Sequence, residues 1–317
     1  MQPKFWDRWL DASIVGGFTR LGYQLRRPQF APLPESLAGR HIAITGANSG
    51  LGAAATQMLA ARGARVSLLC RSTDAAQALV RELAAQHPQA QLEVVACDLA
   101  DLASIDAAAA ALADAPPLDA LINNAGVLNR QRELDERGRE QSFAINVLGT
   151  FALTWALSPR LREDGRIVTV SSGGMYGAAL NLRDPEFRQR RWDGVRAYAE
   201  HKRAQLVLTR RWAELWPRRK VNAMHPGWAA TPGVARSLPG FSRVMGPLLR
   251  PPAEGIDTAV WLAVAPEVER SGAFWCDRRV RPTVRIARTR PRPGDAARLW
   301  RLCVEATGRG AEGQPAA

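Results

Sequence analysis

The sequence has few cysteines, no long apolar run and no apolar leader. Its four cysteines show no paired spacing, which argues against a zinc site and a disulfide framework and favours a reducing compartment. No stretch reaches 18 uninterrupted apolar residues, so an integral membrane protein is not expected. Charged residues, among them Lys4, Asp7 and Arg8, interrupt the region where a signal peptide would have its apolar core. We therefore expect a cytoplasmic protein, with peripheral membrane contact as an open alternative.

Acidic residues are also in short supply, with 30 Asp and Glu against 43 Lys and Arg and a formal net charge of +13. Such an excess suits nucleic acid, anionic lipid or an acidic cofactor. No aromatic-interleaved basic motif or known nucleic-acid module accompanies it, and much of it lies in residues 188–191 and 278–292. We favour a solvated basic surface and expect no nucleic-acid partner.

The two ends of the chain differ from its middle, and no internal repeat is present. Residues 1–35 predict an amphipathic helical extension followed by a Pro-rich linker, with apolar residues at three- and four-residue steps and basic residues between them. A helix packed on the following domain and a membrane-surface anchor over residues 1–27 are equally good interpretations. Residues 291–317 predict a short helix and a flexible tail.

Between these ends, residues 36–290 alternate between short apolar strands and helical patterns. Strands are predicted at 41–45, 65–69, 92–97, 119–123, 166–171, 220–225 and 272–275. Helices are predicted at 50–62, 74–86, 101–114, 133–162, 196–216 and 253–265. This alternation predicts an α/β domain, a doubly wound parallel Rossmann-type sheet of about seven strands with helices on both faces. Its ligand crevice would lie at the carboxyl ends of the strands.

The end of the first predicted strand carries a glycine-rich turn, Thr45-Gly46-Ala47-Asn48-Ser49-Gly50-Leu51-Gly52. Gly46 permits the turn, Gly50 lets the backbone approach a ligand, and Gly52 lets the helix lie against the strand. The first helical turn then offers N–H groups and a partial positive charge to a pyrophosphate. In this strand–turn–helix context the pattern favours nucleotide binding over a purely structural turn.

Four more motifs follow predicted strands or open a predicted helix: Asn123-Asn124-Ala125-Gly126, Ser171-Ser172, Tyr198-Ala199-Glu200-His201-Lys202 and Pro226-Gly227. In this order, over residues 38–280, they resemble the short-chain dehydrogenase/reductases. The resemblance implies a nicotinamide-dependent oxidoreductase. Three longer phrases resemble an orphan subgroup of that family, which has no settled substrate: residues 171–175, 224–234 and 275–278.

The chemistry can be argued from the residues themselves. Tyr198 and Lys202 stand four apart on a predicted helix and share a face. A phenol titrates near 10, so acid/base work near neutrality needs a fall of about two to three units, roughly 3–4 kcal/mol. One cation about 4–5 Å away supplies an energy of that order. Ser172 can donate a hydrogen bond to the substrate oxygen, and by resemblance the backbone of Asn146 holds a water that relays protons towards Lys202. His201 is expected to face solvent.

Cofactor choice follows from the end of the second strand, where NAD(H) enzymes place a carboxylate. This chain has Arg71 there and no acid until Asp74, so we predict NADP(H), with the guanidinium on the 2′-phosphate. Asp98 resembles the family's adenine contact, and its alternative role is a helix N-cap. The resemblance implies these further cofactor contacts: Leu99, Asn124, Ala125, Gly126, Tyr198, Lys202, Pro226, Gly227 and Thr231.

Residues 227–255 stand where the family builds its substrate lid, and the long excursion 176–196 predicts a lobe beside the substrate. The lid is rich in apolar residues: Trp228, Leu238, Phe241, Val244, Met245, Leu248 and Leu249. A lipophilic carbonyl or alcohol is therefore one interpretation, and ordinary core packing is the other. The alternative function is a non-catalytic NADP(H)-binding regulatory or membrane-surface scaffold protein. A homodimer is possible.

Overall fold

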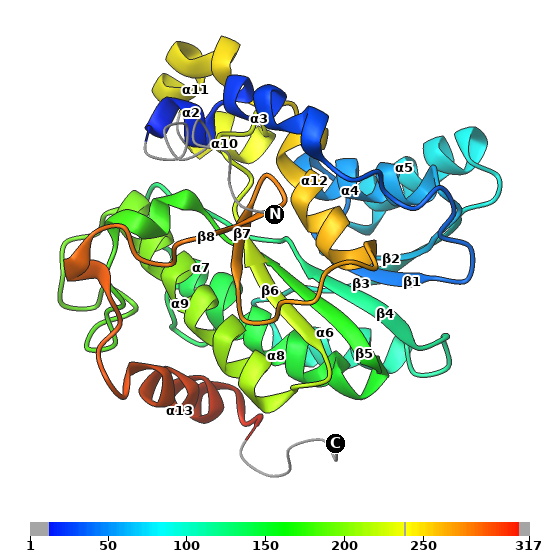
Figure 1. Ribbon diagram of the computed structural model, residues 1–317. Helices are drawn as coiled ribbons and strands as arrows, with labels where there is room; N and C mark the ends of the chain where they lie inside the picture. The colour runs from blue at the N-terminus through cyan, green and yellow to red at the C-terminus, as the bar shows by residue number, and fades with distance from the viewer. Residues whose placement is uncertain (1–12, 238, 311–317) are drawn as a thin grey trace.

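The computed structural model describes residues 13–237 and 239–310. At its centre lies one sheet of eight strands with helices on both faces (Figure 1). The strands are β1 (His41–Thr45), β2 (Arg65–Cys70), β3 (Gln91–Ala96), β4 (Leu118–Asn123), β5 (Leu161–Val170), β6 (Lys220–Met224), β7 (Phe274–Cys276) and β8 (Arg279–Arg281). Their order is β3-β2-β1-β4-β5-β6-β7-β8, and every neighbouring pair is parallel except β7 and β8.

This sheet confirms the predicted α/β class, with one strand more than expected. β1 has the predicted bounds, and the other six predicted strands overlap the observed ones. β8 was missed because Arg279-Val280-Arg281 is too short and too polar to give a strand signal. Because β1 to β7 run parallel, their carboxyl ends meet at one edge of the sheet, where the candidate residues are concentrated.

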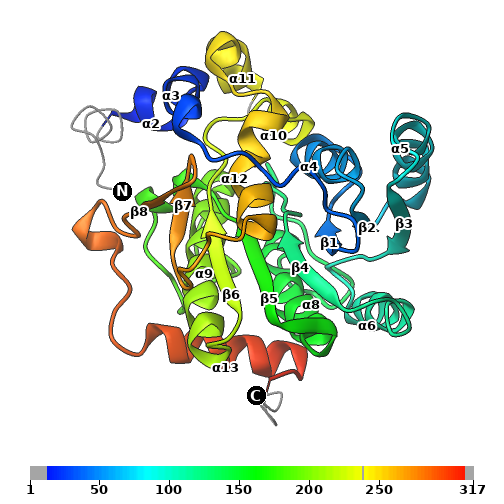
Figure 2. The same ribbon diagram turned by 45° about the vertical axis from the view of Figure 1, so that its right-hand side comes forward.

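The helices cover the two faces in separate groups (Figure 2). One face is packed by α4 (Gly50–Ala60), α5 (Thr73–Gln86) and α12 (Pro252–Val264). The other is packed by α6 (Leu102–Ala111), α8 (Thr150–Leu157), α9 (Gly194–Leu215) and α13 (Asp295–Thr307). Strands β1, β4 and β6 are almost fully buried, as the middle of a sheet covered on both sides requires.

The long helix predicted over 133–162 begins later and changes its winding. It comprises α7 (Gln141–Phe143), a π-helical turn (Ala144–Gly149) and α8. It begins at 141 because the buried Glu140 carboxylate accepts hydrogen bonds from the N–H groups of Ser142 (2.9 Å) and Phe143 (2.6 Å). The stretch Gln141–Arg160 is apolar enough to cross a membrane, but 83% of its most apolar window is buried inside the molecule, as in a core helix.

At the carboxyl edge of the sheet, two pairs of short helices lie side by side (Figures 1 and 2). One pair comes from the N-terminal region, α2 (Ile14–Phe18) and α3 (Arg20–Arg26). The other comes from the predicted lid, α10 (Pro232–Ser237) and α11 (Pro239–Met245). α3 is tied to α12, because Arg20 and Gln24 both donate to the Glu254 carboxylate, at 3.2 and 2.5 Å.

Candidate active site

The turn after β1 has the geometry that its glycines allow. Gly46 and Gly50 have φ values of +62° and +51°, in the left-handed region. A Cβ at Gly52 would lie 2.1 Å from the Gly46 carbonyl oxygen, so α4 can approach β1 this closely only with glycine there. Ser49 is exposed and its side chain makes no capping hydrogen bond. Leu51 packs near Gly255 of α12. The first turn of α4 is partly accessible at Gly50, Leu51 and Ala53 and could hold a pyrophosphate.

The loop after β4 is joined to this turn by four hydrogen bonds. The N–H groups of Asn124 and Ala125 donate to Thr45 Oγ1, each at 2.9 Å. The Asn124 amide donates to the carbonyl oxygens of Thr45 (2.9 Å) and Gly46 (3.3 Å). The two strand ends therefore form one rigid surface on which a dinucleotide could lie.

Asn146, Gly126 and Lys202 converge next to this surface. A Cβ at Gly126 would lie 3.1 Å from Lys202 Nζ and 3.2 Å from Asn146 Oδ1, so glycine leaves room for both side chains. Asn146 exchanges two hydrogen bonds with the backbone of Val127, donating to its oxygen at 2.8 Å and accepting from its N–H at 2.9 Å. The π-helical turn thus fixes Asn146 against the loop after β4.

Gln205 bridges Lys202 and Asn146, a contact that the sequence reasoning missed. Lys202 Nζ donates to Gln205 Oε1 at 3.0 Å and to the Val170 carbonyl oxygen at 2.8 Å. Gln205 Nε2 donates to the Asn146 carbonyl oxygen at 2.6 Å. The Gln205 side-chain amide therefore takes one hydrogen-bonding position on the Asn146 carbonyl oxygen, where the resemblance implied a bound water. The available signal was spacing, since Gln205 follows Lys202 by three residues on the same face of α9.

Tyr198 stands one helical turn before Lys202, whose Nζ lies 5.4 Å from the centroid of the phenol ring. The phenol hydroxyl lies close to Ser172, which stands two residues after the end of strand β5. Ser172 Oγ also accepts from the Gly174 N–H at 3.1 Å. The three predicted catalytic side chains of β5 and α9 are therefore within reach of one another.

Burial shifts the pKa of both Tyr198 and Lys202. Burial raises the pKa of Tyr198 to about 12, and the neighbouring Ser172 hydroxyl opposes this rise. Burial also lowers the pKa of Lys202 to about 7. The sequence argument counted only the attraction between the two charges and omitted the burial that disfavours each of them. An ammonium and a phenolate formed together would offset these burial costs by their attraction.

The adenosine end of the expected cofactor site lies at β2 and β3. Arg71 is exposed directly after β2, next to Ser72, whose carbonyl oxygen accepts from Asn48 Nδ2 at 3.5 Å. Asp98 Oδ1 accepts from the Ala100 N–H at 2.9 Å, but the N-cap of α6 is Asp101, so the N-cap interpretation of Asp98 is wrong. The neighbouring Leu99 is buried.

Pro226 directly precedes the lid, and Gly227 and Thr231 lie in its first residues. A Cβ at Gly50 would lie 3.4 Å from Thr231 Cβ, so the start of α10 contacts the turn after β1. Gly227 has a φ of +71°, and a Cβ there would lie 2.5 Å from the Arg250 guanidinium. Pro226 directly precedes it, and its carbonyl oxygen accepts from Arg250 Nη1 at 3.3 Å.

Only some of the apolar side chains of the lid are buried. The rings of Trp228 and Phe241 meet edge-on with centroids 5.2 Å apart, and Leu249 is buried. Val244, however, is 77% exposed and Leu248 is 38% exposed. Met245 is half-buried, and Leu238 lies outside the described residues.

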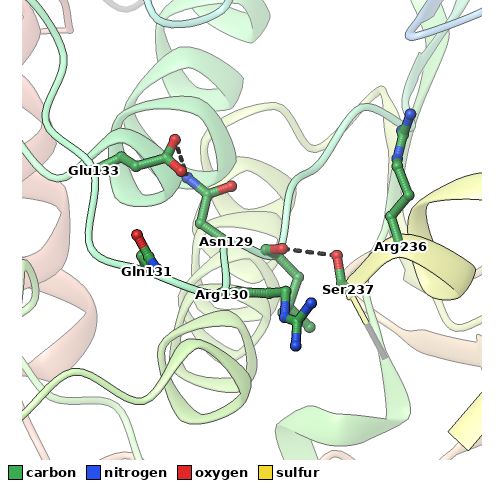
Figure 3. Close-up of a pocket in the computed structure, with 7 residues that line it drawn as sticks. Asn129, Arg130, Gln131, Glu133, Arg236 and Ser237 are labelled. Carbon is green, nitrogen blue, oxygen red and sulfur yellow. Dashed lines mark hydrogen bonds between the residues drawn. The ribbon is translucent and has the colours of Figure 1, made fainter. Parts of the chain in front are cut away.

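A polar cleft of about 690 Å³ lies between the loop after β4 and α10 (Figure 3). Residues 128–131, Glu133, Arg236 and Ser237 line it, and none of them is a predicted catalytic residue. Ser237 Oγ donates to the Leu128 carbonyl oxygen at 2.8 Å, which ties α10 to this loop.

Two predictions concern residues around α9: the one for His201 is wrong, and the structure adds detail to the one for the excursion 176–196. His201 does not face solvent, because it is only 2% exposed and lies 5.5 Å from the Phe143 ring. Burial lowers the pKa of His201 to about 3, which keeps its ring neutral. In the excursion 176–196, Arg190 donates to Glu200 of α9 at 2.9 Å, so part of this segment is anchored to the catalytic helix.

A buried ion cluster behind Gly227 also escaped the sequence reasoning. Asp277, between β7 and β8, accepts from Arg26 of α3 at 2.8 Å and from Arg250 at 2.6 and 3.1 Å. These side chains are at most 1% exposed. No local pattern predicts the cluster, since Arg26 and Asp277 are 251 residues apart. Within residues 13–237 and 239–310, no cluster of His, Cys, Asp and Glu could hold a metal.

With this geometry in place, we compared the chain with known proteins. The profile of the short chain dehydrogenases matches residues 40–239. "Dehydrogenase/reductase SDR family member 12" of Bos taurus is 39% identical over 295 residues, covering 91% of this chain and 93% of the relative. This is the orphan subgroup that the three sequence phrases resemble.

A more distant relative, retinol dehydrogenase 12 of Mus musculus, is 32% identical over 280 residues, which cover 86% of this chain and 87% of the relative. Among solved structures, a short chain dehydrogenase from Shigella flexneri complexed with NADP superimposes with a TM-score of 0.64. It is 26% identical, and the match covers 77% of this chain and 99% of that one.

Proposed function

We propose the following function for this chain, which belongs to the short-chain dehydrogenase/reductase family. Membership of that family makes it an oxidoreductase with a nicotinamide cofactor and a small-molecule substrate. The proposed reaction is the NADP(H)-dependent interconversion of a carbonyl group and an alcohol. The observation that carries it is the arrangement of Tyr198, close to Ser172 and one helical turn from a buried Lys202.

In this proposal, the bound cofactor supplies a hydride to the substrate carbon or accepts one from it. In the reducing direction, the Tyr198 hydroxyl gives its proton to the substrate oxygen, and in the oxidising direction the phenolate takes that proton back. Ser172 Oγ donates a hydrogen bond to the same oxygen as negative charge develops on it. Lys202 stabilises the phenolate, while Gln205 and the Val170 carbonyl oxygen hold the ammonium in place and Asn146 holds Gln205.

The test is Tyr198→Phe, assayed by NADPH consumption with a panel of aldehydes and ketones. We expect kcat to fall by about 10²- to 10⁴-fold, because the general acid is lost, with NADPH affinity within a few-fold of the parent. Tyr176→Phe is the matched control, since that hydroxyl donates to the Pro282 carbonyl oxygen and has no part in the proposed reaction. A Tyr198→Phe enzyme with parental kcat would refute the assignment. Tight NADPH binding without any turnover in the parent would favour the scaffold alternative.

The proposed preference for NADP(H) rests on Arg71, exposed after β2 where no carboxylate stands. A charge-assisted hydrogen bond to a phosphate is worth about 1.5–3 kcal/mol, so Arg71→Ala should raise KM for NADPH about 10- to 100-fold. KM for NADH should change little. Arg81→Ala, at an exposed position on α5, is the control. Equal KM values for NADPH and NADH in the parent would overturn the preference.

We further propose that the substrate is lipophilic, because Trp228 and Phe241 of the lid pack together beside Gly227. A relative named for retinol, a lipophilic alcohol, supports the same substrate class. We expect long-chain and aromatic aldehydes to have higher kcat/KM than small polar sugars. Turnover confined to sugars would exclude it.

Peripheral membrane contact is a second proposal, carried by exposed apolar side chains at one end of the molecule. Leu21 and Leu25 of α3 are 55% and 49% exposed, and Val244 of α11 is 77% exposed. Leucines on a basic surface are suited to the edge of an anionic bilayer. We expect the protein to co-sediment with anionic liposomes and Leu21→Ala/Leu25→Ala to reduce the bound fraction. Sedimentation equal to that of a liposome-free sample would rule the contact out.

A further inference from the structure

The N-terminal helix pair lies over the carboxyl edge of the sheet, next to the lid and not at the far end of the domain (Figure 2). α2 and α3 precede β1 in the chain, yet the ion pairs of α3 are with segments more than 200 residues later. Arg26 pairs with Asp277, and Arg20 pairs with Glu254 of α12. This placement brings a residue of α2 to the residues that follow the catalytic strand.

That residue is Phe18. A Cβ at Gly173 would lie only 1.9 Å from Phe18 Cε1, so the ring rests directly on the Gly173 backbone. The ring also stacks on His225, with centroids 4.9 Å apart, and lies 5.8 Å from the Trp228 ring. The Trp228 N–H donates to the Phe18 carbonyl oxygen at 2.7 Å. Phe18 therefore joins the loop after β5 to the loop after β6.

Both of these loops belong to the proposed site. Gly173 is the residue after Ser172, which lies close to the Tyr198 hydroxyl. Trp228 begins the lid, where it packs against Phe241. The Phe18 ring is half-buried, so it keeps accessible apolar surface beside these groups. A substrate whose oxygen reaches Ser172 would have its flanking group close to this ring.

Phe18 is also firmly held. The Arg250 guanidinium donates to the carbonyl oxygen of Thr19 at 3.1 Å and pairs with Asp277, and Arg26 donates to the Gly16 carbonyl oxygen at 3.0 Å. The backbone on both sides of Phe18 is therefore fixed by buried cations. A side chain fixed in this way can discriminate between substrate shapes.

We propose that the N-terminal helices form one wall of the substrate pocket, and that Phe18 is a specificity-determining residue that favours an apolar group next to the reacting carbonyl. The inference rests on the proposed function and gives the N-terminal segment a role in substrate selection. It does not require contact between Phe18 and the cofactor.

The experiment compares decanal, benzaldehyde and acetaldehyde as substrates of the parent enzyme, Phe18→Ala and Phe18→Leu. Loss of the ring should lower kcat/KM for decanal and benzaldehyde by about 10- to 100-fold, mainly through KM, while acetaldehyde changes by less than about threefold. Phe18→Leu should fall between the parent and Phe18→Ala. NADPH affinity, measured by fluorescence, should stay within about twofold, which also reports that each variant is folded.

Leu134→Ala is the control, since it removes an apolar side chain that is 52% exposed and lies outside the N-terminal helices. We expect its kcat/KM for all three aldehydes to equal that of the parent in liposome-free buffer. Unchanged ratios among the aldehydes in a folded Phe18→Ala enzyme would overturn the inference and leave the proposed function standing.

A parent enzyme that reduces none of these aldehydes would contradict the proposed function. The inference is then tested by calorimetric titration of the NADPH-loaded protein with 1-decanol. If Phe18→Ala weakens the binding of 1-decanol at least tenfold, the result would support the proposed pocket wall in a protein without aldehyde reduction. Equal binding to both proteins, or binding to neither, would overturn it.

Discussion

Asp277 is the carboxylate of the buried ion cluster, and its replacement by Asn should strongly destabilise the protein. It accepts hydrogen bonds from Arg26 at 2.8 Å and from Arg250 at 2.6 and 3.1 Å. Asn has the same size, and it tolerates the left-handed φ of +52° found at this position. The substitution therefore removes the charge with little added strain. Removing one partner of a buried ion pair costs about 3–5 kcal/mol, because the other charge stays buried.

Urea unfolding followed by tryptophan fluorescence measures this loss, since the chain has ten tryptophans. A domain has a free energy of unfolding of about 5–15 kcal/mol, so Asp277→Asn should remove about a fifth or more of it. The control is Glu214→Gln, which removes an exposed pair with Arg211 at 3.1 Å. We expect that control to cost no more than about 1 kcal/mol.

The pH dependence of this loss has a definite sign. Burial acts to raise the pKa of Asp277, but attraction to Arg250 and Arg26 outweighs it and holds the pKa below its usual value. A carboxyl group with a lowered pKa stabilises the folded state above its unfolded pKa, about 3.9, and loses that contribution as the pH falls through the folded pKa. The stability gap between parent and Asp277→Asn should hold from pH 7 to 5 and shrink below about 4. A gap under 1 kcal/mol at pH 7, or one that widens in acid, would refute the reasoning.

Two further substitutions test the site. Gly52→Ala should lower the free energy of unfolding by about 1–3 kcal/mol and weaken NADPH binding, since the new Cβ would collide with the Gly46 carbonyl oxygen. Thermal unfolding measures the first effect and NADPH fluorescence the second. The control Gly240→Ala, where no atom lies within 4 Å of the new Cβ, should be nearly neutral. Gln205→Leu removes an acceptor from the Lys202 ammonium, whose pKa is about 7, so the alkaline limb of the kcat/KM profile should move to lower pH by about one unit. Gln205→Glu should move it the other way, and two identical profiles would count against a positioning role for Gln205.

The parts of the fold that the sequence predicted well depend on local patterns. β1 has the predicted bounds because a β-branched run meets Gly46, and α4 begins at Gly50 as the glycine turn indicates. The predicted helix over 133–162 was too long at its start, because the pattern gave no weight to Glu140 as a buried cap. The parallel sheet followed from the alternation of strands and helices, and the antiparallel β8 did not.

The candidate site could be predicted only where its residues stand in short motifs. Ser172, Tyr198 and Lys202 fall in such motifs, and the fold places all three at one edge of the sheet. Gln205 and Phe18 have no motif of their own, and their contacts exist only once distant segments have packed. The pKa values depend on burial, which no local pattern reports, and for that reason the expected lowering at Tyr198 was wrong in sign.

The contact between Arg26 and Asp277 also constrains the order of assembly. Residues 13–29 leave the ribosome early, but their anchoring partners, Arg250, Glu254 and Asp277, are synthesised more than 200 residues later. Contacts of such long range form late, since the loop between them must close first. During synthesis the glycine turn can take shape before this wall is in place. The apolar face of the first segment is then uncovered, and a chaperone that shields it would act before the C-terminal third has emerged.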